Sequence, residues 1–231
     1  AMKIRIKFSK TGAMKFIGHL DVMRYFQKLV RRADIPIAYS SGMSPHQIMS
    51  FALPLGIGLT SDAEYVDIEL TEPVLSADAI RRMNETSVEG IKILSFRELP
   101  ENAGNAIASV TAADYRIAFR QEYAPPFVLD AAFEDFFSQK ELPVMKKTKK
   151  SEREIDLKPY IYWHDVSKDT ITLRLSCGSV TNIKPELVMS AFFQQQKVPF
   201  EEYGLLIKRL ELFTGENDKF LSLNEIGTDI M

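Results

Sequence analysis

The chain opens with a strict alternation of apolar and basic residues. Residues 3–8 place three apolar side chains on one face and three basic side chains on the other, which predicts a half-buried strand. From Gly18 to Ala33 the apolar residues recur at helical spacing, which predicts an amphipathic helix. Similar patterns predict strands over residues 35–39, 64–70 and 91–96, an apolar segment over 48–53, and a helix that begins near Ser76.

The expected order of these elements is β-α-β-β-α-β, which is typical of a ferredoxin-like unit. After a linker at residues 100–109 the order repeats, with a strand at 114–120, a helix at 127–137, a long hairpin at 144–176, a helix at 185–195 and a strand at 205–213. The fold class is therefore predicted to be α+β, with two ferredoxin-like (βαββαβ) halves in tandem and helices on one face of antiparallel sheets. The predicted halves are residues 2–99 and 110–214, and residues 215–231 are predicted to be a loosely ordered tail.

Composition narrows the classes of function. The formal net charge of -2 means that any nucleic-acid binding would come from a local basic patch. The single cysteine, Cys177, excludes a disulfide framework and a thiolate metal cluster within one chain. The apolar stretch at residues 48–59 is too short for a membrane span, and the start has no hydrophobic signal region. We therefore expect a cytoplasmic protein without membrane contact.

Two segments concentrate positive charge. On the expected helix, Arg24, Lys28 and Arg31 share one stripe, with Arg32 beside it and Lys10 nearby in sequence. Such clusters bind phosphate backbones, although a solvated helix face has the same pattern. The second segment lies in the expected long hairpin, where a solvated mobile loop is the alternative to a binding loop, and its basic residues are Lys146, Lys147, Lys149, Lys150 and Arg153.

Weaker signals accompany these two segments. Lys158 lies beside Tyr160 and Tyr162 on an expected strand, an arrangement on which single-stranded nucleic acid stacks, but ordinary strand tyrosines are the commoner explanation. Two Gly- and Ser-containing turns would present backbone N–H groups to a phosphate, although neither matches a known phosphate-loop fingerprint and a structural turn explains both. Their candidate residues are Thr11 in the first turn and Ser40, Gly42 and Ser44 in the second.

The histidines raise the question of catalysis. His19 lies near Asp21 at the expected helix start, and His46 ends the second turn. A His-Asp pair is suited to acid–base chemistry, and two histidines with a carboxylate are suited to a metal. No close-spaced ligand motif is present, however, and His19 equally fits a polar residue at a helix terminus. We therefore assign no catalytic residue and no metal site.

Several motifs resemble one known family. They are Phe8-Ser-Lys-Thr-Gly12, Phe16-Ile-Gly-His-Leu-Asp21, Ile37-Ala-Tyr-Ser-Ser-Gly-Met-Ser-Pro-His46, Ser50-Phe-Ala-Leu-Pro-Leu-Gly56 and Ile155-Asp-Leu-Lys-Pro159. The chain is similar to the radical-SAM-linked family, a bacterial domain of unknown function. That domain occurs separately or fused to the C-terminal end of a radical SAM protein with a B12-binding-type domain. The chain departs from the pattern at Gly18, where a small hydroxyl residue is expected before the histidine.

The resemblance implies partnership with such a radical SAM protein. With one cysteine this chain has no CxxxCxxC cluster, so the iron–sulfur cluster and S-adenosylmethionine would belong to the partner and this chain would carry no cofactor. The leading hypothesis is a non-catalytic module that binds RNA or presents it to the radical SAM enzyme, in RNA modification. One alternative is a protein-interaction adaptor that makes no RNA contact. Another is a small hydrolase or transferase that uses His19, Asp21 and His46.

Overall fold

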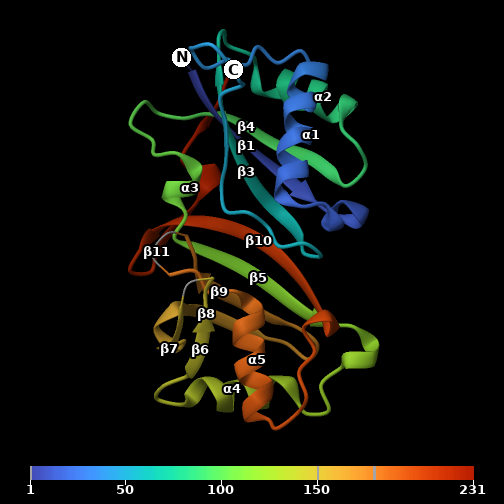
Figure 1. The fold of residues 1–231 in the computed structure, drawn as a ribbon, viewed down its shortest axis with the longest axis vertical. Coiled ribbons are helices and arrows are strands. Elements are labelled where there is room, and N and C mark those ends of the chain that lie inside the picture. The colour runs from blue at the N-terminus through green and yellow to red at the C-terminus, as the bar shows by residue number, and fades with distance from the viewer. Residues whose placement is uncertain (1, 150, 179–180) are drawn as a thin grey trace. The chain divides into compact units, whose positions relative to one another are not determined.

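The computed structural model describes residues 2–149, 151–178 and 181–231, which form a mixed α+β protein with mostly antiparallel sheet and five α-helices (Figure 1). The chain divides into two units. The first unit contains the residues up to Thr111 together with Arg209–Met231, and the second contains Ala112–Lys208. Among the described residues, no helix is long and apolar enough to cross a membrane.

The sheet of the first unit is built around its first strand. This strand, β1, pairs antiparallel with β3 and with β4, and β2 pairs with the outer side of β3. The order is therefore β4-β1-β3-β2, as the elements β1 (Met2–Lys10), β2 (Met49–Phe51), β3 (Thr60–Leu70) and β4 (Ile91–Glu98). The alternation predicted for β1 is confirmed, because Ile4, Ile6 and Phe8 are buried in the core.

Two helices cover one face of this sheet. Helix α1 (His19–Arg32) follows a short 3-10 turn at Gly12–Phe16, and α2 (Ser76–Thr86) lies beside it (Figure 1). Phe26 and Met83 are fully buried between the helices and the sheet. The predicted amphipathic helix is confirmed, since its apolar stripe faces the sheet and its charged stripe faces outward.

The opposite face of the sheet is also covered, which the alternation of β1 did not indicate. Arg5 is only 2% exposed, and its Nε and Nη2 donate to the two carboxylate oxygens of Asp67 at 2.8 and 2.9 Å. The guanidinium also donates to the carbonyls of Gly104 and Leu223. Segments distant in sequence, including α3 (Ala106–Ser109), therefore close over a charged side chain that alternation alone assigns to solvent.

The first unit also contains Arg209–Met231, which covers the end of the predicted second half and the whole predicted tail. Strand β10 (Leu205–Glu216) begins in the second unit and ends in the first, where β11 (Lys219–Ser222) pairs with it. A 3-10 turn at Leu223–Glu225 has a capping box, and β12 (Thr228–Asp229) pairs with β4. This division of the chain differs from the expected one, which kept residues 110–214 together and left 215–231 as a tail.

The second unit contains antiparallel strands and two helices. Strands β8 and β5 both pair antiparallel with β9, and the helices α4 and α5 pack together through an aromatic core of Phe133, Phe136 and Phe192. A separate two-stranded ribbon is formed by β6 and β7 alone. The elements are β5 (Ala112–Phe119), α4 (Leu129–Ser138), β6 (Pro143–Lys147), β7 (Glu152–Asp156), β8 (Ile161–Val166), β9 (Ile171–Ser176) and α5 (Pro185–Gln195).

Two predictions of β structure, one hairpin and one strand, were wrong in detail. The hairpin expected over residues 144–176 is two hairpins, because a 3-10 turn at Lys158–Tyr160 contains Pro159, which has no N–H for a ladder. The strand expected over residues 35–39 is reduced to two isolated bridges, at Ile37 and Tyr39. Pro36 again removes a donor within that segment.

Candidate nucleic-acid interface

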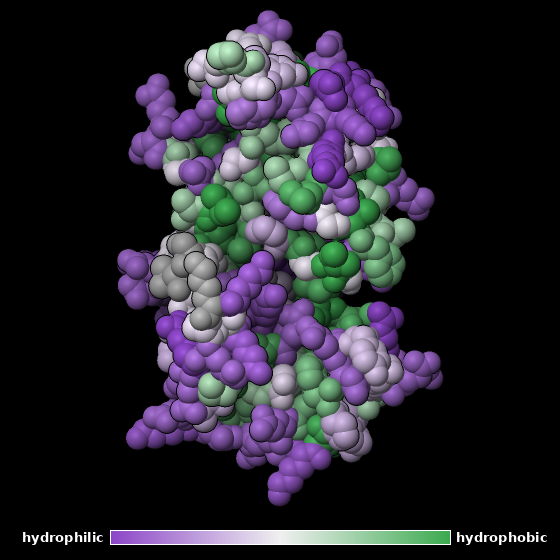
Figure 2. All heavy atoms as spheres, in the orientation of Figure 1, coloured by the Kyte–Doolittle hydropathy of each residue, from purple (hydrophilic) through white to green (hydrophobic). Residues whose placement is uncertain are grey.

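The basic stripe of α1 is exposed over its length. Arg24, Lys28 and Arg31 lie opposite the buried residues of the helix, and Arg32 is exposed beside them. Within this stripe Arg24 forms an ion pair with Asp21 at 3.4 Å, and both of those side chains are mostly exposed. Figure 2 shows hydrophilic side chains over the part of the surface where α1 lies in Figure 1. Such an exposed ion pair contributes little to stability. Because Asp21 is one carboxylate beside four basic side chains, the stripe keeps a net positive charge.

The turn at residues 40–46 closes on itself beside this helix. The Ser40 hydroxyl lies 2.9 Å from Nδ1 of His46 and accepts a hydrogen bond from the His46 backbone N–H. Gly42 has a φ of +113°, and both Gly42 and Ser44 are exposed at the tip. The next residue, Gln47, donates its amide Nε2 to the carbonyl of Gln27 on α1 at 3.1 Å. The turn and the basic helix, two separate candidates in the sequence, are therefore neighbours in the first unit.

Lys10 is placed in the interior and not on this surface. It is 2% exposed, and its ammonium donates to the carbonyl of Ile17 at 2.7 Å, which holds the turn before α1. Burial lowers the pKa of Lys10, and Glu64 opposes that effect. The adjacent residue Thr11 donates its backbone N–H to the carbonyl of Gly90 at 2.8 Å. The Lys10 ammonium and the Thr11 backbone N–H are therefore both used in contacts within the fold.

His19 is half-buried next to Lys10. Its ring packs edge-on against Phe51, with the centroids 5.6 Å apart, and it lines a pocket of ≈ 20 Å³ with Lys10 and Glu64. That volume is about the size of one water molecule, too small for a substrate. Among the described residues no hydrogen bond or ion pair joins His19 to Asp21 or to His46. The residues that the structure describes include no group of three or more His, Cys, Asp and Glu side chains placed to hold a metal.

A buried ion pair in this region was missed by the sequence analysis. Arg209 of β10 donates to both carboxylate oxygens of Glu64 of β3, at 3.1 and 3.0 Å, and Ser61 also donates to Glu64. The guanidinium further donates to the carbonyls of Leu53 and Pro54. It therefore holds the segment Ser50–Gly56, which is one of the family-like motifs. No sequence signal pairs residues 145 positions apart, so only the fold could find this contact.

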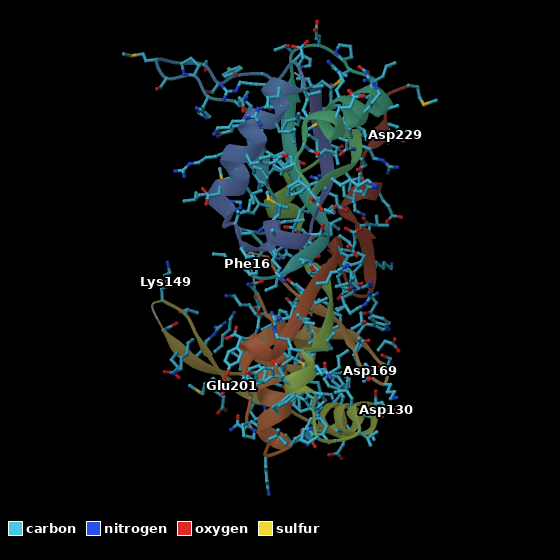
Figure 3. The ribbon with its side chains drawn as sticks, turned by 90° about the vertical axis from the view of Figure 1, so that its right-hand side faces the viewer. Phe16, Asp130, Lys149, Asp169, Glu201 and Asp229 are labelled. Carbon is cyan, nitrogen blue, oxygen red and sulfur yellow. The ribbon has the colours of Figure 1, made fainter. Side chains whose placement is uncertain are left out.

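In the second unit the β6–β7 ribbon carries the other basic segment. Lys146 and Arg153 lie directly opposite each other on the ribbon, while Lys147 pairs with Glu152 at 3.4 Å. Burial and, less strongly, Arg153 lower the pKa of Lys146, as expected for two like charges across a ladder. Lys149 projects from the tip of the ribbon (Figure 3). Lys150, another candidate, lies outside the described residues.

Lys158 does not belong to this exposed set. Its ammonium donates to the carbonyls of Phe137 and Gln139 at the end of α4, and it lies 5.0 Å from the centre of the Phe137 ring. A cation at this position satisfies carbonyls that a helix end leaves without partners. Lys158 therefore caps α4.

A comparison with family models identifies the chain. Residues 3–185, more than half of the sequence, match the family described as "Uncharacterized protein conserved in bacteria (DUF2344)". A search of curated proteins gives no match. The chain belongs to this bacterial family, DUF2344.

Proposed function

We propose that this protein is a non-catalytic RNA-binding module that presents RNA to a radical SAM enzyme. The observation that carries the proposal is the exposed stripe of Arg24, Lys28 and Arg31, three cations on one helix face, of which Arg24 forms an exposed ion pair with Asp21. Cationic side chains that bind phosphates release the counterions of the nucleic acid, which favours a nucleic acid as the ligand. The family resemblance supplies the enzyme partner, which would hold the iron–sulfur cluster and S-adenosylmethionine.

The double variant Arg24→Glu/Arg31→Glu is expected to weaken binding of bulk transfer RNA by more than about tenfold, because two phosphate contacts become repulsive. The measurement is fluorescence anisotropy at two salt concentrations, in which the affinity of the unchanged protein falls steeply with salt. Circular dichroism would show that the variant is folded.

A matched control is Arg81→Glu/Lys92→Glu, which changes the net charge by the same amount. Arg81 already pairs with Asp78 and Glu85 on α2, and Lys92 is exposed on β4. This control should keep most of the affinity. Equal losses in the two double variants would show that only overall charge matters and would overturn the role of α1.

A second candidate function is a protein-interaction adaptor. Three large apolar side chains, Phe16, Leu20 and Ile57, are 65%, 65% and 67% exposed. They belong to neighbouring segments, because the Gly58 backbone N–H donates to the Lys15 carbonyl at 2.8 Å. Exposed apolar clusters often mark protein contacts.

If this patch binds a radical SAM protein, Leu20→Glu/Ile57→Glu should abolish co-purification of the two proteins after co-expression and leave RNA affinity nearly unchanged. The physical reason is that two buried carboxylates at an apolar contact have no partners. Undiminished co-purification of this variant would exclude the patch as the docking surface.

We further propose that both units have ferredoxin-like architecture. The order β4-β1-β3-β2 of the first unit and the order β10-β5-β9-β8 of the second both correspond to a βαββαβ chain, with β6–β7 inserted after α4. An experimental structure with another strand order in either unit would contradict this.

A further inference from the structure

A groove of ≈ 780 Å³ lies within the second unit between β6, the start of α5 and the segment that follows α5. This volume is in the range of pockets that hold small molecules or single nucleotides. Its walls include lysines of the basic β6–β7 ribbon, which are not part of the α1 stripe. Figure 3 shows Glu201, one of its lining residues, and the ribbon that ends at Lys149.

The charges in the groove are separated by sign. Lys146, Lys147 and Lys184 supply positive charge from the ribbon and from the residue before α5. Glu201 and Glu202 supply negative charge from the segment after α5. A ligand that fits this arrangement has an anionic part and a part that donates hydrogen bonds.

Glu186 lies between the two sets. It lines the groove from the first turn of α5, and its Oε2 atom is buried without a hydrogen-bond partner among the described residues. Burial raises the pKa of this carboxyl, and Glu202 adds to the effect, while its own backbone N–H and Lys184 oppose it. A buried acceptor without a partner is uncommon in folded proteins and indicates a group that completes its hydrogen bonding on binding.

One of the lining residues of the groove, Phe200, offers an aromatic ring. Phe200 is half-buried, and its ring packs tilted against Phe193 with the centroids 5.5 Å apart. A base stacks on such a ring whatever its sequence identity. Stacking, phosphate contact and a carboxyl acceptor together describe the recognition of one unpaired nucleotide.

We propose that this groove binds one single-stranded nucleotide whose base carries an exocyclic amino group. This inference rests on the proposed RNA-binding function and deepens it. The phosphate lies against Lys146, Lys147 and Lys184, the base stacks on Phe200, and the amino group donates to Glu186. Uracil is disfavoured because its ring N–H is flanked by two carbonyl oxygens, which a carboxylate repels.

The test uses short labelled oligoadenylate, oligocytidylate and oligouridylate in anisotropy titrations with the full chain. The two amino-bearing oligomers are expected to bind about tenfold more tightly than oligouridylate, the difference expected for one hydrogen bond to a charged group. Glu186→Leu should remove this preference, and Lys184→Glu should weaken all three oligomers together. The matched control is Glu122→Leu, at an exposed position of the second unit outside the groove, which should keep the preference.

The outcomes separate the two proposals. If transfer RNA binds and Arg24→Glu/Arg31→Glu weakens it, but the oligomers show no base preference or Glu186→Leu leaves it intact, the groove proposal is wrong and the proposed function stands. If no RNA binds at low salt, both fail. Tighter binding of an acidic peptide such as oligoglutamate than of any oligonucleotide would assign the groove to a protein segment and overturn the inference.

Discussion

Replacing Glu64 with glutamine is expected to destabilise the first unit by about 3–5 kcal/mol, the cost of removing one partner of a buried ion pair. Arg209 and Glu64 are 3% and 8% exposed, so the guanidinium would be left without its counter-charge in the interior. Lys10, also buried nearby, loses its opposing carboxylate in the same change. Two cations would then share a site from which water is largely excluded.

The measurement is urea denaturation followed by far-UV circular dichroism and by fluorescence. The single tryptophan, Trp163, lies in β8 of the second unit, so its fluorescence follows that unit, while circular dichroism follows both. Asp229→Asn is the matched control, because it breaks the half-exposed pair with Arg97 and should cost less than about 1 kcal/mol. A loss in Glu64→Gln no larger than in this control would show that the buried pair is not required.

Phe133→Ala is expected to destabilise the second unit by about 3–5 kcal/mol, through lost burial and the cavity that remains. Phe133 is fully buried, and its ring lies 5.2 Å from that of Phe192 on α5 and 5.5 Å from the ring of His164 on β8. The change removes one of the aromatic contacts that pack α4 against α5. Because Lys184 immediately precedes α5 and Glu186 lies in its first turn, we also expect weaker discrimination between oligonucleotides.

Denaturation followed by Trp163 fluorescence tests this loss directly, since the tryptophan lies on the strand next to His164. Val128→Ala is the control, because Val128 precedes α4 and is 70% exposed. Its free energy of unfolding should change by less than about 0.5 kcal/mol. A similar small change in Phe133→Ala would mean that the aromatic cluster closes over the cavity or contributes little.

Much of the local structure follows from the sequence. The helix at Pro185–Gln195 has the predicted bounds, because Pro185 suits a first turn and apolar residues follow at helical spacing. The buried face of β1 also follows from alternation, which is a local property of a strand. Prediction failed where a proline removed a ladder donor, as at Pro36 and Pro159, because a hydrophobic pattern does not register the missing N–H.

The candidate site was predicted in part. The exposed stripe of Arg24, Lys28 and Arg31 depends only on helix periodicity, so the sequence determined it. The groove could not be predicted, because Lys146, Glu186 and Phe200 come from three separate segments. The unpartnered oxygen of Glu186 is likewise a property of how those segments pack.

By itself, the sequence determined most of the helices and strands, the basic stripe of α1 and the family-like motifs, since each depends on neighbours along the chain. The tertiary structure alone decided which other charged residues are buried. Arg5 and Arg209 are buried where carboxylates and carbonyls distant in sequence accept hydrogen bonds from them, and Lys10 is buried where the Ile17 carbonyl accepts from its ammonium. The hydrophobic pattern of the sequence does not record these partners. A cation is available to a ligand where the fold leaves it on the surface, as with the exposed cations of α1 and of the β6–β7 ribbon.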